Sequence, residues 1–172
     1  MQKKVQTKKM ALFGMLVALA FILSYVERLI PFQFGVPGIK LGLANIVVLI
    51  GLYTLGAKSA FSLSIIRVLL TGFTFGNMYT MWYSLAGAML SFICMALLKR
   101  CKGFSIVGVS VAGGVAHNVG QIVVAMIVLG KSIIYYLAVL LVAGVVTGVL
   151  IGIIGASILK QVRRAFKIII GE

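Results

Sequence analysis

Four polar side chains suited to ligand binding stand in otherwise apolar stretches of the sequence. Arg67 occurs in the segment SIIRVLL, and the single histidine, His117, occurs with Asn118 and Gln121 in the segment AHNVGQ. On a helix, His117 and Gln121 share one face because they are four residues apart, and Asn118 widens that polar face. A guanidinium is always charged, whereas the other three side chains donate or accept hydrogen bonds. These residue types favour a site for a small molecule with an anionic group.

Catalysis is not indicated by the remaining side chains. The chain has two acidic residues, Glu27 and Glu172, and no Asp. It therefore lacks a carboxylate pair for general acid–base chemistry or for a metal ion. The segment GLYTLGAKS departs from the phosphate-binding pattern G-x4-G-K-[ST], because Ala57 precedes Lys58. We expect no enzymatic activity, no cofactor, no metal ion and no ATPase site in this chain.

The composition is that of an integral membrane protein. Hydrophobic residues make up 62% of the 172 residues and charged residues 10%, whereas soluble domains have about 45–50% and about 25%. A net charge of +14 would suggest nucleic-acid binding in a soluble protein. Cytoplasmic loops of membrane proteins also collect Lys and Arg, however. We therefore predict an all-α membrane protein and no nucleic-acid partner.

Six apolar segments divide the chain into a predicted six-helix bundle. A spanning helix needs about 20 apolar residues, and the second and third segments are shorter than that. The predicted spans are 10–25, 41–55, 59–71, 79–98, 104–129 and 133–159. We expect one membrane domain at 10–159, between a basic N-terminal segment at 1–9 and a basic tail at 160–172.

The basic residues predict how this bundle is oriented. With the N-terminus inside, twelve of the 16 Lys and Arg residues fall on the inner side, and Arg67 lies within a span. The outer side holds the other three: Arg28, Lys40 and Lys131. This asymmetry follows the positive-inside rule and predicts that both termini are cytoplasmic. The basic start and the motif Ala18-Leu19-Ala20 also fit a secretory signal, but the first segment completes an even number of spans.

The cost of burying Arg67 leaves two interpretations open. Nine residues beyond Lys58, Arg67 would lie about 13 Å into the bilayer at helical rise, where a lone charge costs several kcal/mol. In one interpretation, Arg67 and the polar face at 117–121 line a cavity that is open to the outside and neutralise an anionic ligand. In the other, Arg67 pairs with Glu27 at the outer end of the first span. The polar residues of the fifth span then only hydrogen-bond between helices.

Two predicted outer loops could cover such a cavity. Their sequences, IPFQFGVPGIKLG and TGFTFGNMY, are rich in glycine and aromatic residues, and the first ends close to Lys40. They would form a basic, aromatic lid, although surface loops without function would look similar. The candidate ligand-binding residues are Arg67, His117, Asn118, Gln121, Lys40, Asn45 and Asn77.

Small residues recur at four-residue spacing in two of the later spans. They stand at 108, 112, 116 and 120, and again at 144, 148, 152 and 156. This spacing favours close packing within the bundle. The first span also carries Ala11, Gly14 and Ala18, which could form a face for docking onto a partner membrane protein.

Two segments resemble a bacterial membrane family. They are PGIKLGLANIVVLIGLYTLGAKSAFSLSIIRVLLTGFTFG at 37–76 and AHNVGQ at 116–121. They resemble the Gx transporter family, often labelled heptaprenyl diphosphate synthase component I. More broadly, the chain looks like the substrate-binding S components of energy-coupling-factor (ECF) transporters. The resemblance implies a six-helix protein of the bacterial cytoplasmic membrane whose ligand site opens outward. It also implies that Ala11, Gly14 and Ala18 dock onto a transmembrane coupling protein, which works with separate ATPase subunits.

The resemblance implies two alternative functions. The first is a substrate-binding subunit for uptake of a small vitamin-like, flavin-like or isoprenoid ligand with an anionic group. The second, suggested by the family label, is a non-catalytic accessory subunit of isoprenoid or quinone synthesis or of extracellular electron-transfer machinery. Because magnesium on a diphosphate is held by carboxylates, a chain without Asp cannot be the catalytic subunit of a prenyl diphosphate synthase.

Overall fold

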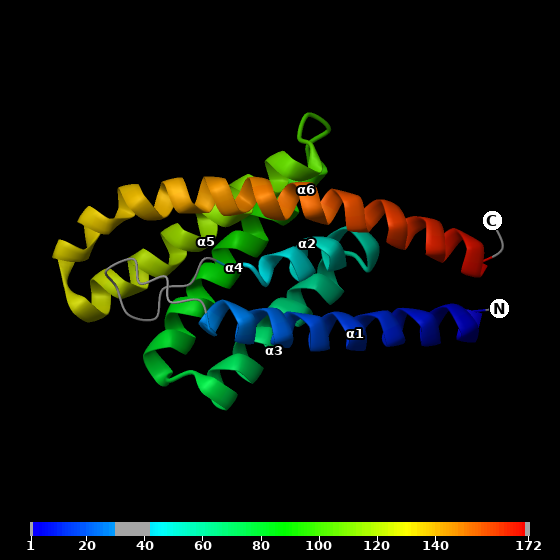
Figure 1. Ribbon diagram of the computed structural model, residues 1–172, viewed down its shortest axis with the longest axis horizontal. Coiled ribbons are helices and arrows are strands. Elements are labelled where there is room, and N and C mark those ends of the chain that lie inside the picture. Colours follow the sequence, from blue (N-terminus) through cyan, green and yellow to red (C-terminus); the bar gives the residue numbers. More distant parts are fainter. Residues whose placement is uncertain (1, 30–41, 171–172) are drawn as a thin grey trace.

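The computed structural model describes residues 2–29 and 42–170, and the regular structure of these residues is helical throughout. Six α-helices and one short 3-10 helix, η1, follow one another along these ranges (Figure 1). They are α1 (Gln2–Leu29), α2 (Asn45–Thr54), α3 (Ala57–Phe75), α4 (Met78–Arg100), α5 (Ile106–Leu129), η1 (Lys131–Tyr136) and α6 (Leu137–Ile170). The predicted all-α, six-helix architecture is confirmed for the described residues.

Five of the helical segments are long and apolar enough to cross a membrane, and α2 is the exception. With 10 residues, α2 is about 15 Å long, so the prediction of a short second segment is confirmed. The prediction of a short third segment is wrong, because α3 has 19 residues. The helix continues through 71–75, where the hydroxyls of Thr71 and Thr74 donate to the carbonyls of Arg67 and Leu70. Such bonds let polar residues remain in an apolar helix.

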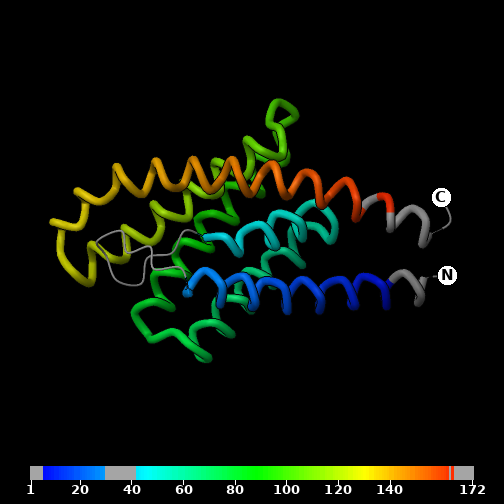
Figure 2. Tube along the Cα trace, in the orientation of Figure 1, coloured from blue at the N-terminus to red at the C-terminus, as the bar shows by residue number. Residues whose placement is uncertain are grey.

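The long helices α1 and α6 run lengthwise through the molecule, and α2 contacts both of them (Figures 1 and 2). The start of α1 and the end of α6 lie at the same end of the molecule, and η1 lies at the opposite end (Figure 1). α1 begins at Gln2 and α6 continues to Ile170, so the basic ends of the chain continue these helices. This common end agrees with the prediction that both termini lie on the same side of the membrane. The side of the membrane that they face stays a prediction.

Glycines bring α5 into backbone contact with the helices on either side. A Cβ atom added to Gly114 would lie 2.5 Å from the carbonyl oxygen of Gly144, and one added to Gly148 would lie 2.6 Å from Cα of Val111. Both contacts join α5 to α6. On the side of α4, a Cβ atom on Gly120 would lie 2.7 Å from the carbonyl oxygen of Ala86. The close packing predicted from small residues at 120, 144 and 148 is confirmed.

Aromatic side chains join the ends of α1 and α3. The ring centroid of Phe75 lies 5.2 Å from that of Phe21 and 5.6 Å from that of Tyr25. The guanidinium carbon of Arg28 lies 5.7 Å from the centroid of the same Phe75 ring, within the range of a cation–π contact. This cluster fixes the last turns of α1, which carry Glu27, beside α3.

The short helix α2 is buried along most of its length, and its C-terminal end is capped by a side chain of α4. Lys99 Nζ donates to the carbonyl oxygen of Leu52 at 2.5 Å and lies 5.0 Å from the ring centroid of Tyr53. The last carbonyls of a helix have no partner within the helix, and a cation at this end is also favoured by the helix dipole. Lys99 thus stabilises the C-terminal end of α2.

Candidate ligand-binding site

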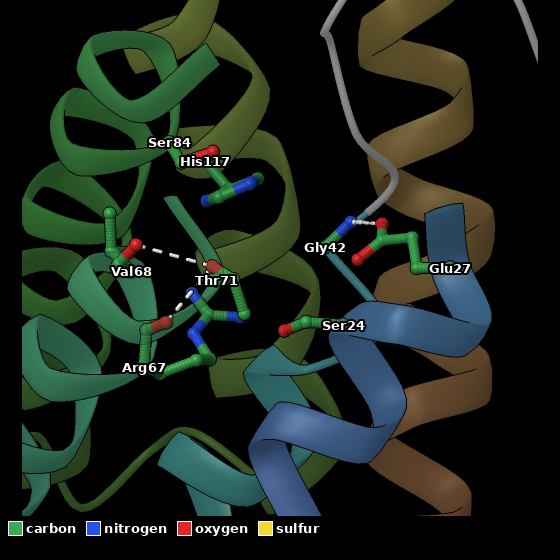
Figure 3. Close-up of a pocket in the computed structure, with 8 residues that line it drawn as sticks. All are labelled: Ser24, Glu27, Gly42, Arg67, Val68, Thr71, Ser84 and His117. Carbon is green, nitrogen blue, oxygen red and sulfur yellow. Dashed lines mark hydrogen bonds between the residues drawn. The ribbon is translucent and has the colours of Figure 1, made fainter. Parts of the chain in front are cut away.

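A polar pocket lies where α1, the start of α2 and α3 meet α4 and α5 (Figure 3). It comprises about 260 Å³ of space including its open mouth, and its enclosed part has room only for a group the size of a water molecule. Pockets for drug-sized ligands measure about 300–1,000 Å³, far more than this enclosed part. The pocket in this state therefore accommodates one small group of a ligand. Its lining residues are Ser24, Glu27, Gly42, Arg67, Val68, Thr71, Ser84 and His117.

Arg67 lies on the face of α3 that is turned toward the bundle, and 5% of its surface is exposed. Its Nη2 donates to Oδ1 of Asn45, the first residue of α2, at 3.2 Å. Nε of Arg67 and Nδ2 of Asn45 are buried and have no hydrogen-bond partner within the described part of the chain. An unsatisfied buried donor costs about 1–3 kcal/mol. Arg67 lines the pocket and Asn45 does not, so Nε of Arg67 is the unused donor here that an oxygen of a ligand could accept from.

Glu27 lies on the last turns of α1 and joins this helix to the start of α2. Its Oε1 accepts the backbone N–H groups of Gly42 and, at 3.3 Å, of Leu43. Gly42 has a φ of +82°, and a Cβ atom there would lie 3.0 Å from Cδ2 of His117. Only glycine adopts this conformation without strain, so the chain needs a glycine here to enter α2. The carboxylate also attracts the guanidinium of Arg67.

The polar residues of α5 point in different directions. His117 lines the pocket, and Gln121 Nε2 lies 2.5 Å from His117 Nε2. Asn118 instead donates from Nδ2 to the carbonyl oxygen of Leu140 on α6 at 2.7 Å. Both Asn118 and Gln121 are fully buried. Thus Arg67 and His117 face the same pocket, Gln121 contacts His117, and Asn118 joins two helices.

Comparison with known proteins places the chain in a family. Residues 16–158 match the family model described as heptaprenyl diphosphate synthase component I. The chain belongs to this family. Every residue that lines the pocket falls within the matched range. The resemblance predicted from the segments at 37–76 and 116–121 is therefore confirmed. No curated protein matches the sequence.

This member of the heptaprenyl diphosphate synthase component I family also resembles a solved transporter structure. The match covers 97% of this chain and 99% of the S component of a bacterial ECF transporter, with a TM-score of 0.58 and 18% sequence identity. At this identity the similarity shows the fold alone. Together with five helices of membrane-spanning length, the S-component fold identifies a multi-pass membrane protein.

The candidate residue Asn77 lies away from the pocket in this family member. Asn77 is the N-cap of α4: its Oδ1 accepts the backbone N–H of Thr80 at 2.8 Å, and Thr80 Oγ1 accepts the N–H of Asn77 at 2.9 Å. This reciprocal pair is a capping box. Lys40 lies outside the described residues, so its part in the site stays a prediction.

Three hydroxyl-bearing residues of the pocket were not anticipated from the sequence: Ser24, Thr71 and Ser84. Serine and threonine often bond to a carbonyl of their own helix and then carry no functional signal, as Thr71 does. Ser24 could have been found, because it stands three residues before Glu27 and so shares its helix face. For Ser84, the informative observation is a buried hydroxyl without a partner in the described residues, which only the structure provides.

Replacing Asn77 with alanine is expected to destabilise α4 and to leave ligand binding unchanged. Loss of an N-cap side chain costs about 1 kcal/mol, and Asn77 is exposed. Thermal unfolding of the purified protein in detergent measures the first effect, and the amount of ligand that co-purifies measures the second. Asn77→Ser retains a capping oxygen and serves as the control. Loss of ligand from a fully stable Asn77→Ala variant would show that Asn77 contacts the ligand.

Proposed function

We propose that the protein is the substrate-binding membrane subunit of an ECF-type uptake transporter. In this proposal the pocket takes up an anionic group of a small vitamin-like, flavin-like or isoprenoid ligand. The observation that carries the proposal is the buried guanidinium of Arg67, which lines a polar pocket and has an unpartnered Nε among the described residues. Support also comes from the fold shared with an S component of a bacterial ECF transporter.

The arrangement around Arg67 suits an anion. Nε of Arg67 and the hydroxyl of Ser84 belong to pocket residues and are buried donors without partners in the described residues. The pocket also includes Gly42 at the start of α2, where the helix dipole favours negative charge. A carboxylate or phosphate oxygen would satisfy these donors, whereas an apolar group would leave them unsatisfied. The rest of the ligand would extend through the open mouth.

The transport proposal requires a pocket that opens to the outside and termini in the cytoplasm. We expect Lys131→Cys, in a chain whose Cys94 and Cys101 are changed to alanine, to react with a membrane-impermeant maleimide in intact cells. Lys58→Cys, at the start of α3, should react only after permeabilisation, because the positive-inside rule places Lys58 in the cytoplasm. The reverse pattern of labelling would show the opposite orientation.

The proposed partner face is on α1. Ala11, Gly14 and Ala18 are exposed, and a Cβ atom added to Gly14 would have no atom within 4 Å. We propose that this face docks onto a transmembrane coupling protein, since small residues let two helix backbones approach closely. The coupling protein would in turn bind the ATPase subunits.

Gly14→Leu and Ala18→Leu are therefore expected to weaken co-purification of coupling and ATPase subunits about tenfold or more, equivalent to at least about 1.4 kcal/mol. Both variants should remain folded. Ala138→Leu, at an exposed alanine of α6, is the matched control and should co-purify partners normally. Unchanged co-purification by both α1 variants would contradict the docking face.

The same experiment tests a second function. The family is described as heptaprenyl diphosphate synthase component I, which favours a non-catalytic accessory subunit of isoprenoid or quinone synthesis or of electron-transfer machinery. Mass spectrometry of the proteins that co-purify with the wild-type chain separates the two. ATPase and coupling subunits support the transporter, and a prenyl synthase or a redox protein without them supports the accessory subunit.

A further inference from the structure

The pocket already holds an anion of its own, the carboxylate of Glu27. Glu27 is 8% exposed, and its Oε1 accepts the N–H groups of Gly42 and Leu43. These groups precede the first turn of α2, in which the N–H of Asn45 bonds to the carbonyl oxygen of Gly42. A carboxylate at the start of a helix is stabilised by the N–H groups and by the helix dipole.

The donors left without partners lie around this same space. Figure 3 shows Glu27 with Gly42 on one side of the pocket and Arg67 on the other, with Ser84 beside His117. Ser84 is 7% exposed and its hydroxyl has no partner in the described residues, nor has Nε of Arg67. A second anion in this pocket would approach the Glu27 carboxylate closely. Like charges at such distances disfavour each other strongly.

We infer that Glu27 is an internal competitor of the ligand: the anionic group of the ligand binds at Arg67 and the start of α2 by displacing the Glu27 carboxylate from the N–H groups of Gly42 and Leu43. The inference rests on the proposed function, because it concerns the same pocket. Because Glu27 belongs to α1, its displacement releases the end of α1 from the start of α2. Occupancy of the pocket is thereby coupled to the helix that carries the proposed partner face.

Two thiosulfonate reagents of opposite charge test the inference without knowledge of the natural ligand. A cysteine is placed in the pocket by Ser84→Cys, with Cys94 and Cys101 changed to alanine. Its modification rate is measured with sulfonatoethyl methanethiosulfonate, an anion, and with trimethylammonioethyl methanethiosulfonate, a cation. We expect Glu27→Gln to raise the ratio of the anionic to the cationic rate about tenfold or more, equivalent to at least about 1.4 kcal/mol. Glu172→Gln removes the chain's other acidic side chain and should leave the ratio unchanged.

Glu27→Asp separates displacement from a simple effect of charge. Aspartate keeps the charge but is one methylene shorter, so it releases the N–H groups of Gly42 and Leu43. We expect it also to raise the anionic rate above that of the Glu27 chain. If Glu27→Gln raises the anionic rate but Glu27→Asp does not, then Glu27 acts only through its negative charge, and the inference is overturned. Equal increases for both reagents would mean a loosened pocket and would overturn it too, as would an unreactive cysteine in the Glu27→Gln chain.

Arg67→Gln in the same Ser84→Cys chain separates the displacement of Glu27 from the anion-binding role of Arg67, on which the proposed function rests. If Arg67 binds anions, this change lowers the anionic rate relative to the cationic rate. An unchanged ratio would contradict the anion-binding role of Arg67 itself. A lowered ratio for Arg67→Gln together with no effect of Glu27→Gln would leave the proposed function standing and remove only the displacement of Glu27.

Discussion

Arg67→Gln is expected to abolish ligand retention by the purified protein while the chain still folds into the membrane. Removing one partner of a buried charge-assisted contact costs about 2–5 kcal/mol, or about 30-fold or more in affinity. Native mass spectrometry of protein purified in detergent from cells measures the fraction that carries a ligand. It also gives the ligand mass. Arg100→Gln changes an exposed arginine at the end of α4 and should retain the ligand like the wild type.

The alternative role of Arg67, as the structural partner of Glu27, makes a different prediction. In that case Glu27→Gln should lower the thermal stability about as much as Arg67→Gln, and the double variant should lose little more, because residues within one interaction are not additive. In the structure, the guanidinium donates to Asn45 and the Glu27 carboxylate accepts from the start of α2. Unchanged ligand retention by Arg67→Gln would rule out the ligand role.

Gly148→Leu is expected to unfold the protein or to prevent its accumulation in the membrane. A Cβ atom at this position would lie 2.6 Å from Cα of Val111 on α5. Backbone cannot yield as a flexible side chain can, so α5 and α6 would have to move apart. Overpacking alone costs about 1–3 kcal/mol, and separating the helices also loses their contacts. Gly148→Ala should show the same effect to a smaller degree.

Thermal unfolding of the detergent-purified protein, followed by size-exclusion chromatography, measures this loss. Gly14→Leu is the matched control, because a Cβ atom on Gly14 meets no atom within 4 Å. It should unfold near the temperature of the wild type. A Gly148→Leu chain as stable as the control would show that α5 and α6 are not held by close backbone contact.

The helical membrane fold could be predicted because hydropathy and small-residue spacing are properties of single segments. The pocket could be predicted only in part. His117 and Asn118 are neighbours in the sequence, yet one lines the pocket and the other bonds to α6. Which of them faces the site depends on which helices lie on either side of α5, and that is not encoded locally. The polar side chain of Asn77 has two interpretations from the sequence, since Asn77 and Thr80 just before an apolar run also fit a helix start.

The close glycine contacts on both sides of α5 make the packing of the molecule uneven. α5 packs far more extensively against α4 and α6 than α1 packs against α2 or α3, so α4, α5 and α6 form a rigid layer. α1 is more loosely held, and elements with fewer contacts open at lower free energy. Ser24 and Glu27 line the pocket from α1, whereas Ser84 and His117 line it from the rigid layer. We therefore expect the pocket to widen by movement of α1 rather than of α4 or α5.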